Sequence, residues 1–443
     1  MNKKPNILLI MADELRADTT GFGGNPIVRT PNLDALAATS AVFQSAYTPA
    51  PICIPARQCI AAGQLPTTCK CLQWYDDLPA GYLTFPRLLS QYGYETVACG
   101  KLHHVGPDQM QGYTKRIGME CEVAQPFIPG LKQPRDAFSA KWSQTQEVLR
   151  ATDTVKTFHI RQDEMAIAGA EFFIEQYFCD PFYGRNTPDV PLLLTASFNQ
   201  PHYPYVADPA LLQYYMDKVT PYENEPLFDH SFLSMYAVDV PHQAMVRATA
   251  AYYAMIETMD SYVGRLVSAL TRAGQNLADW VILFTSDHGE MLGQHGVWEK
   301  QKFFEASARV PLFIHLPGQT EGSGVTSNVN LCDLYATICA QAQIPLPKDL
   351  DSRDLTPLVQ GNAESWDNES VSIFDGTNIM IKRDMLKYQY YATDNTEVLF
   401  DLSADNTENA NLIHLPQYAA AVNRFRQRIR HFGFTRKENQ HDT

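Results

Sequence analysis

The stretch Asn6-Ile7-Leu8-Leu9-Ile10-Met11, which runs into Ala12-Asp13-Glu14, decides the fold class of this chain. Every residue from Ile7 to Met11 is apolar, as expected for a central parallel strand with both faces covered. Similar apolar runs follow at 191–197 (PLLLTAS) and 280–285 (WVILFT), and helical patterns lie between the strands at 164–177 and 246–273. Strands that alternate with helices predict an α/β domain built on a mostly parallel sheet with helices on both faces.

The pattern changes after about residue 347. Turn residues separate short apolar runs, as in a small antiparallel meander, at 371–374, 379–381, 387–392 and 398–402. A helical pattern at 416–432 follows. We therefore expect an α/β domain over residues 1–347 and a smaller α+β domain, with an antiparallel sheet and a terminal helix, over 348–443. The segment 108–157 is interpreted as a long insertion that shapes a substrate pocket.

Composition excludes several classes of protein. The formal net charge is -14 in 443 residues, which argues against nucleic acid or an anionic membrane as a partner, because both attract basic surfaces. No stretch reaches the roughly 18 apolar residues of a membrane-spanning helix, and the first apolar run is too short for a secretory signal. Nine scattered cysteines, with only Cys69-Lys70-Cys71 closely spaced, fit free thiols and a cytoplasmic location.

Polar side chains follow predicted strands at the point where each strand ends. Asp13 and Glu14 follow the first strand, and Asp287 and His288 follow the run at 280–285. The carboxyl ends of parallel strands meet at one edge of a sheet, where carboxylates can hold a hard cation. An acidic pair at a helix start would explain Asp13 and Glu14 equally well. The second pair adds a carboxylate and an imidazole at the same edge and favours a metal site.

Two further strands are followed by basic or titratable residues. Lys101 and His103 lie in Gly100-Lys101-Leu102-His103-His104, after an expected strand at 94–98, and His202 follows the run at 191–197. A single lysine or histidine is more often a surface charge or a satisfied buried group. Their shared place beyond strand ends favours a functional role, although we assign none to His104.

The pentapeptide Cys53-Ile54-Pro55-Ala56-Arg57 completes the set of candidate motifs. By itself Cys53 fits a small buried residue, which is what most free cysteines are. A five-residue match also carries a risk of coincidence, so the other motifs must decide its meaning.

Together these motifs resemble the type I sulfatases, a branch of the alkaline phosphatase superfamily, and they follow that family's order over most of the chain. The stretches 100–112 (GKLHHVGPDQMQG) and 298–312 look most like the choline-sulfatase group. The resemblance implies an alkaline-phosphatase-like fold and a sulfuric ester hydrolase. It also implies that a maturation enzyme oxidises Cys53 to formylglycine, the nucleophile that attacks a sulfate monoester. The substrate would be a sulfated carbohydrate, a choline-type ester or an aryl ester.

The resemblance implies a metal site as well. One divalent ion, usually Ca²⁺ with Mg²⁺ or Mn²⁺ as alternatives, is expected to bind Asp13, Cys53, Asp287 and His288. Glu14 occupies a place where many relatives carry a second aspartate, so it joins the expected ligands with the coordination number open.

The remaining roles also come from the resemblance. Arg57 and Lys101 are expected to stabilise the nucleophile and the growing charge, and Lys101 and Lys300 to bind sulfate. His202 is expected to protonate the departing alcohol, and His103 to remove a proton afterwards. Lys302 is the rival of Lys300, because it lies only two residues away.

Alternative functions stay open at this point. The closest is a phosphonate or phosphate ester hydrolase of the same superfamily, against which Lys101 and His103 argue. The others are a non-catalytic binding protein, a phosphoglycerate-mutase-like enzyme, and a cysteine hydrolase using Cys53 with His103 or His202. The chain carries Tyr75-Asp76-Asp77 where choline-sulfatase relatives often read Tyr-Asp-Asn. An unpaired acid at this place would repel an approaching sulfate, which argues against choline sulfate as the substrate. The basic, aromatic tail at 425–434 is a candidate interface for a homo-oligomer.

Overall fold

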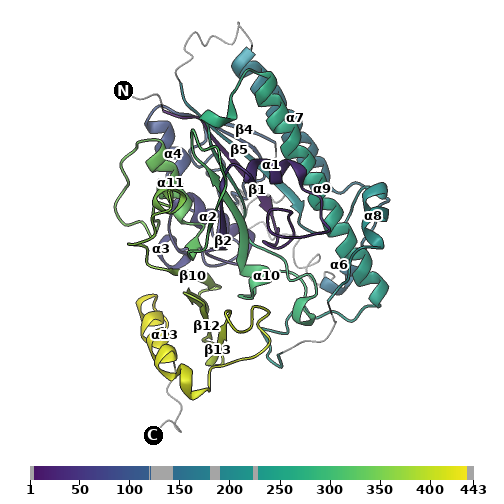
Figure 1. Ribbon diagram of the computed structural model, residues 1–443, viewed down its shortest axis with the longest axis vertical. Helices are drawn as coiled ribbons and strands as arrows, with labels where there is room; N and C mark the ends of the chain where they lie inside the picture. Colours follow the sequence, from purple (N-terminus) through teal and green to yellow (C-terminus); the bar gives the residue numbers. More distant parts are fainter. Residues whose placement is uncertain (1–3, 119, 121–142, 180–189, 223–227, 437–443) are drawn as a thin grey trace.

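The main sheet is mixed but mostly parallel. The protein is represented by a computed structural model that describes residues 4–118, 120, 143–179, 190–222 and 228–436 (Figure 1). The strand order is β4-β3-β5-β1-β6-β7-β2-β8, with β9 paired to β2. The strands are β1 Ile7–Asp13, β2 Ala41–Tyr47, β3 Glu95–Gly100, β4 Lys115–Ile117, β5 Leu192–Pro201, β6 Val281–Ser286, β7 Arg309–His315, β8 Ser323–Val325 and β9 Val329–Asn330.

Strands β3, β5, β1 and β6 are neighbours and run parallel, so their carboxyl ends lie at one edge of the sheet. Strand β7 runs antiparallel to both β6 and β2, which makes the sheet mixed. The three apolar runs of the sequence are confirmed as β1, β5 and β6.

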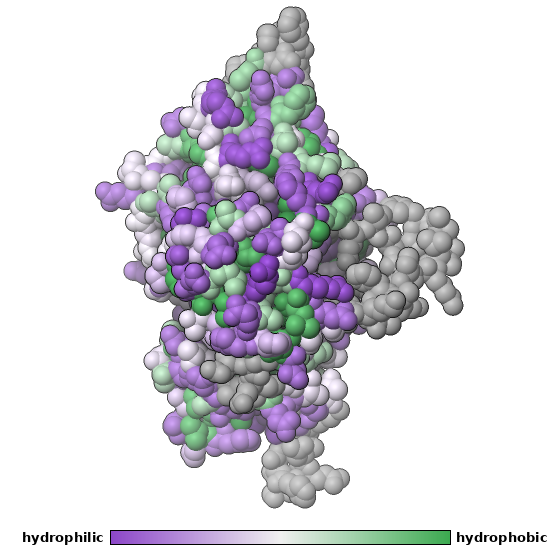
Figure 2. All heavy atoms as spheres, turned by 90° about the vertical axis from the view of Figure 1, so that its right-hand side faces the viewer, coloured by the Kyte–Doolittle hydropathy of each residue, from purple (hydrophilic) through white to green (hydrophobic). Residues whose placement is uncertain are grey.

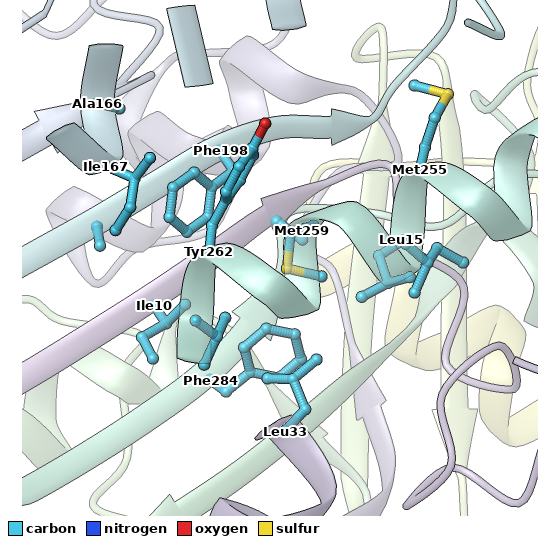
Figure 3. Close-up of a cluster of buried hydrophobic side chains, with 14 of the residues drawn as sticks. Ile10, Leu15, Leu33, Ala166, Ile167, Phe198, Met255, Met259, Tyr262 and Phe284 are labelled. Carbon is cyan, nitrogen blue, oxygen red and sulfur yellow. The ribbon is translucent and has the colours of Figure 1, made fainter. Parts of the chain in front are cut away.

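Both faces of β1 are buried, which explains its unbroken apolar run. Leu8 and Ile10 belong to one hydrophobic core and Ile7 and Leu9 to the other. Figure 3 shows part of the first core, where α9 crosses the strands that carry Ile10 and Phe284. Helices of the first face are α1 Pro31–Ala37, α6 Gln144–Leu149, α7 Phe158–Cys179, α8 Pro209–Met216 and α9 His242–Arg272. Those of the second are α2 Cys53–Ala62, α4 Phe85–Gln91, α11 Asp333–Gln341 and α12 Thr356–Val359.

A separate antiparallel sheet lies toward the C-terminus. It runs β10-β11-β12-β13 and is covered by α13 Ala419–His431 (Figure 1). Its strands are β10 Glu369–Phe374, β11 Asn378–Arg383, β12 Leu386–Tyr391 and β13 Thr396–Asp401. The predicted α/β fold with an antiparallel C-terminal sheet is therefore confirmed. The domain boundary at 347/348 stays a prediction.

Most apolar side chains of the C-terminal tail are buried within the chain, and Phe432 is partly buried. Val422, Phe425 and Ile429 on α13 pack with residues of the second sheet, and Phe434 is also buried. The homo-oligomer interface expected at 425–434 stays a prediction.

Other surface features agree with an ordinary globular protein. On the face turned to the viewer in Figure 2, hydrophobic residues lie singly or in small groups among hydrophilic ones. In the described part of the chain, every helix is too short or too polar to cross a membrane. Of the insertion expected at 108–157, residues 119 and 121–142 lie outside the described residues.

A buried ion cluster connects the second sheet to the main domain. Lys387 of β12 is fully buried, and its Nζ lies 2.8 Å from an oxygen of Glu305 and 2.9 Å from one of Glu408. Glu305 begins the short helix α10 Glu305–Ala308, just before β7. Arg309 also pairs with Glu305, whereas Lys387 is the only cation that pairs with Glu408 among the described residues.

We predict that Lys387→Met lowers the free energy of unfolding by about 3–5 kcal/mol, because it leaves a buried carboxylate without its cation. Urea denaturation of the variant and the wild type measures the difference. The control is Arg265→Met, which removes a partly exposed pair with Glu171 and should cost about 1 kcal/mol or less. Equal losses in the two variants would contradict the prediction.

Candidate active site

The carboxyl ends of the parallel strands bring the predicted residues together. Asp13 is the last residue of β1, Lys101 follows β3, and His202 follows β5. Asp287 and His288 follow β6. Because these strands are neighbours, their terminal side chains converge beyond one edge of the sheet.

Cys53 reaches this edge from the first turn of α2. Its Sγ lies 3.0 Å from Nε2 of His288 and 3.5 Å from Oδ1 of Asp13. Every residue of α2 is buried, and the helix ends at Gly63 with a φ of 65°. A Cβ at Gly63 would lie 2.7 Å from the ring of Tyr335, so only glycine allows this close packing. Packing along the whole helix thus fixes the position of Cys53.

Four residues at this edge form a group that fits a divalent metal ion. One ligand atom each from Asp13, Cys53, Asp287 and His288 lies within 4.8 Å of the others, and all four side chains are buried. Nδ1 of His288 donates to the carbonyl of Gly289 at 2.9 Å, so its Nε2 lone pair faces the group. Buried carboxylates beside a free imidazole nitrogen are a donor set that metal ions use.

Asp13 is held as a carboxylate by the cations around it. Burial alone would raise the pKa of its carboxyl, but Lys101, with His202 and Arg57, lowers that pKa well below its ordinary value. Lys101 makes the closest ion pair, to Oδ2 of Asp13. A permanently charged carboxylate at this point suits a cation ligand.

Arg57 lies behind the two aspartates. Its Nε donates to Oδ2 of Asp287 at 2.7 Å, and its Nη1 donates to the carbonyl of Lys101 at 3.0 Å and to Ser197 Oγ at 2.9 Å. It also lies 3.6 Å from Oδ2 of Asp13. These contacts orient the aspartates and the end of β3.

Lys300, Glu14 and His202 form a second buried cluster beside the first. Nζ of Lys300 lies 2.8 Å from Oε2 of Glu14 and 2.8 Å from Nε2 of His202. Burial, with Glu290 nearby, raises the pKa of Glu14 although Lys300 opposes the shift. Glu14 also forms a possible metal-binding group with Asp13 and His202, so the structure leaves its ligand role a prediction.

The two predicted catalytic histidines are neutral in this environment. Burial, followed by Lys300, lowers the pKa of His202, whose Nδ1 donates to the carbonyl of Tyr203 at 2.6 Å. Burial, followed by Lys101, lowers the pKa of His103, whose ring meets Trp74 edge to face. Both rings are therefore uncharged imidazoles that can accept a proton. The neighbouring His104 bonds instead to the carbonyl of Gln109, away from these groups.

The Cys53 environment argues against a thiolate nucleophile. Burial, with Asp13 adding to it, raises the pKa of the Cys53 thiol well above its ordinary value. A cysteine hydrolase needs a lowered thiol pKa. The imidazole that contacts Cys53 in the described structure is that of His288, at 3.0 Å from Sγ.

Lys302 does not share the position of Lys300. Its Nζ is buried without a hydrogen-bond partner among the described residues, and it lies 4.5 Å from the ring centre of Phe232 and 5.0 Å from that of Tyr236. Glu299 and Gln301 on either side of Lys300 have φ values of 71° and 69°, so this loop follows neither helical nor extended geometry. The loop conformation therefore separates the side chains of two lysines that lie only two residues apart in the sequence.

The buried amine of Lys302 predicts a pH dependence of stability. Burial lowers the pKa of Lys302 to about 7, whereas an unfolded lysine has a pKa of about 10.4. Between those values the unfolded state binds one more proton, so stability rises with pH by up to about 1.4 kcal/mol per unit. We expect Lys302→Met to be more stable than the wild type at pH 7, by a margin that shrinks toward pH 10. Urea titrations of both proteins at several pH values measure this difference in the free energy of unfolding. A difference that stays constant with pH would contradict the prediction.

One residue near the site carried no sequence signal. The ring of His159, near the start of α7, meets the ring of His202 edge to face at 5.4 Å, and it also bonds to the carbonyl of Tyr203. Burial, followed by Lys101, lowers the pKa of His159 to about 4. No motif surrounds His159 in the sequence. Its proximity to His202 depends on where the start of α7 lies in the fold.

The acidic residues that seemed to oppose a sulfate are paired. Oδ2 of Asp76 accepts from the backbone N–H groups of Leu72 and Gln73, both at 2.8 Å. Oδ1 of Asp77 accepts from Gln111 at 2.7 Å. Both carboxylates hold loops together through neutral donors, and burial raises the pKa of Asp77 to about 6.

A buried group that could hold a metal ion lies with lysines and imidazoles at the strand ends of an α/β sheet, as expected for a hydrolase of the alkaline phosphatase type. Comparisons agree: a sulfatase family model matches residues 5–344, and a model of the N-sulphoglucosamine sulphohydrolase C-terminal region matches 293–434. The chain is 34% identical to a choline-sulfatase of Rhizobium meliloti, covering 94% of this chain and 83% of the relative. The chain belongs to the sulfatase family and is a sulfuric ester hydrolase.

Solved structures share its fold. A phosphonate monoester hydrolase of Agrobacterium radiobacter superposes with a TM-score of 0.75 at 21% identity, covering 97% of this chain and 95% of that chain. BT4656, solved in complex with D-glucosamine-2-N,6-O-disulfate, gives a TM-score of 0.76 at 18% identity and covers 97% of both chains. At these identities the likeness concerns the fold alone.

Proposed function

We propose that this sulfatase hydrolyses a sulfate monoester with a formylglycine made from Cys53 and one divalent metal ion. The observation that carries the proposal is the placement of Cys53 Sγ, which lies against Asp13 and His288 at the start of a fully buried helix. Formylglycine supplies, once hydrated, an oxygen nucleophile at this position. The raised pKa of the unmodified thiol supports the need for that conversion. A formylglycine-generating maturation enzyme is the partner that the proposal requires.

Asp13, Asp287, His288 and the side chain at position 53 would hold the metal, with Glu14 as a further candidate. When bound, a divalent ion supplies positive charge that stabilises a neighbouring oxygen anion. Carboxylates suit Ca²⁺, the ion expected from the family, whereas the imidazole of His288 also suits Mn²⁺. Arg57 serves as a positioning residue, because it bonds to Asp287 and to the Lys101 backbone.

Lys101 and Lys300 provide the cations for the sulfate group. Both are buried, and the charge of each lowers the pKa of the Cys53 thiol, which supports a role for these lysines at the position of attack. Fixed charges in a site from which water is largely excluded act strongly on developing negative charge. We infer that sulfate binds between these two lysines.

His202 would act as the proton donor to the leaving alcohol. Its Nδ1–H is held by Tyr203, so Nε2 is the atom that gains and loses the proton. An anionic sulfate in the site favours the charged imidazole, so substrate binding itself would protonate His202. His103, held neutral by burial and Lys101, is suited to accept a proton later in the cycle.

We predict that His202→Ala lowers kcat by about 10²–10⁴-fold for an alkyl sulfate but far less for 4-nitrophenyl sulfate, whose leaving group needs no proton. Steady-state rates on both esters measure the contrast. His104→Asn is a matched control, since this buried ring contacts Gln109 and lies outside the proposed proton path. Equal losses on the two esters would remove His202 as the acid.

The alcohol half of the substrate is proposed as a choline-type ester, a sulfated carbohydrate or an aryl group. The choline-sulfatase relative supports the first. The alternative is a phosphonate or phosphate ester. We expect the matured enzyme to turn over choline sulfate, sulfated monosaccharides or aryl sulfates faster than aryl phosphonates in parallel assays. A preference for the phosphonate would overturn the proposal.

A further inference from the structure

Three cysteines that the proposed reaction does not use lie together beneath the other end of α2. Sγ of Cys59, on α2, lies 3.5 Å from Sγ of Cys69, at the end of the short helix α3 Pro66–Cys69. Cys71 lies beside them, with its Sγ 3.9 Å from the carbonyl of Cys69. All three are buried, and none forms a disulfide in the structure.

The arrangement suits a pair of sulfurs better than a metal site. Among the described residues, the groups whose ligand atoms converge well enough for an ion are both at the active site, and these thiols form no such group. A disulfide needs only two sulfurs whose Cβ atoms lie about 3.5–4.5 Å apart. The sulfurs of Cys59 and Cys69 lie 3.5 Å apart, which is van der Waals contact, so bond formation requires them to approach by about 1.5 Å.

Cys69 is the more reactive partner. The contacts with Cys59 and then Cys71 lower the pKa of Cys69, while burial raises the pKa of Cys59. Cys69 is 5% exposed whereas Cys59 is 0% exposed, so an oxidant from solvent meets Cys69 first. A thiolate near the surface beside a second thiol is the arrangement of an oxidisable pair.

We propose that Cys59 and Cys69 form a reversible disulfide when a hydroperoxide reaches the folded protein. The Cys69 sulfur attacks the terminal peroxide oxygen, the O–O bond breaks, and the alcohol or water leaves, giving a sulfenic acid on Cys69. The Cys59 sulfur then attacks that sulfur, the S–O bond breaks, and the hydroxyl leaves as water with the Cys59 proton. Overall, two thiols and one hydroperoxide give one disulfide, one alcohol or water, and one further water.

The bond ties α2 to α3 across the turn at Gly63. Both cysteines pack in the same hydrophobic cluster as residues of the second sheet, including Val371 and Ile373 of β10. Oxidation therefore cross-links the helix that carries Cys53 to the segment that contacts the C-terminal sheet. For a loop of this length we expect the thermal midpoint to rise by about 3–5 °C.

Peptide mapping tests the inference directly. Trypsin cleaves after Arg57 and Lys70, so Cys59 and Cys69 share the peptide 58–70, whereas Cys71 lies on the next one. The folded full-length protein is treated with hydrogen peroxide, alkylated in denaturant and digested without reductant. We expect peptide 58–70 to be lighter by two hydrogens, without alkylation, and to regain both thiols after treatment with dithiothreitol.

Matched variants make the test specific. Cys71→Ala should still give the closed 58–70 peptide, while Cys59→Ala and Cys69→Ala should not. The exposed Cys179 reports that the oxidant acted, and the buried Cys339 reports a thiol that should stay reduced. A cross-link between Cys69 and Cys71 would overturn the assignment. The assignment would also fail if Cys59 and Cys69 were both alkylated while Cys179 was oxidised. It would fail as well if added Zn²⁺ bound the three thiols and protected them from oxidation. None of these results depends on sulfatase activity.

Discussion

Replacing Cys53 with serine is expected to abolish sulfate ester hydrolysis while leaving the protein folded. Serine has nearly the shape of cysteine, and its hydroxyl can keep the contacts of Sγ to His288 and Asp13. If formylglycine from Cys53 is the nucleophile, the variant loses the reacting group itself. Loss of a nucleophile costs about 10⁴-fold or more in kcat.

The measurement combines rates with peptide masses. In active wild-type protein made in a competent host, the tryptic peptide 30–57 should be lighter by about 18 mass units than its thiol form. Cys339→Ala is the control, because this buried cysteine lies in α11 away from the site. A fully active enzyme with an intact thiol at Cys53 that alkylation inactivates would instead support a cysteine hydrolase.

The second large effect is expected from Lys300 and not from Lys302. Lys300→Ala removes the ammonium that lies 2.8 Å from His202 and acts on the position of attack, so we expect kcat/KM to fall by about 10²–10³-fold. Lys302→Met removes an amine that lies over Phe232 and Tyr236, and activity should stay within a few-fold of the wild type.

The two variants control for each other. Both remove a buried amine from the same loop, so a general disturbance of that loop would lower both activities alike. Equal losses would therefore contradict the assignment of Lys300 to sulfate. A loss confined to Lys302→Met would reverse it. Melting curves of both proteins, recorded beside the kinetics, separate unfolding from a missing charge.

The fold class was largely predictable because its central strands share one sequence feature, a continuous apolar run. A strand buried on both faces needs a continuous apolar run, and β1, β5 and β6 supply three such runs, each ending in polar residues. Strand order and the reversed direction of β7 were not predictable from these runs. They depend on pairings between distant segments, such as Phe43 with Leu312.

The sequence predicted which site residues lie close together wherever these residues follow the end of a strand. Asp13, Lys101, His202, Asp287 and His288 are all of this kind. Loop geometry decided the rest. The left-handed backbone at Glu299 and Gln301 separates Lys300 from Lys302, and the start of α7 brings His159 to His202. The guanidinium of Arg57 lies behind the aspartates because of contacts with Ser197 and the Lys101 carbonyl, which no local motif encodes.

The complete burial of α2 has a consequence for how an active molecule is made. Cys53 has no exposed surface in the folded chain, and the whole helix around it is enclosed. An enzyme that rewrites this cysteine must therefore reach it during or soon after synthesis, before the surrounding layers close. If Cys53 is matured as proposed, folding and maturation would compete in time, and a chain that folded first would be trapped as a thiol. The active fraction of a preparation would be set by expression rate and temperature, and purification of the folded protein could not restore it.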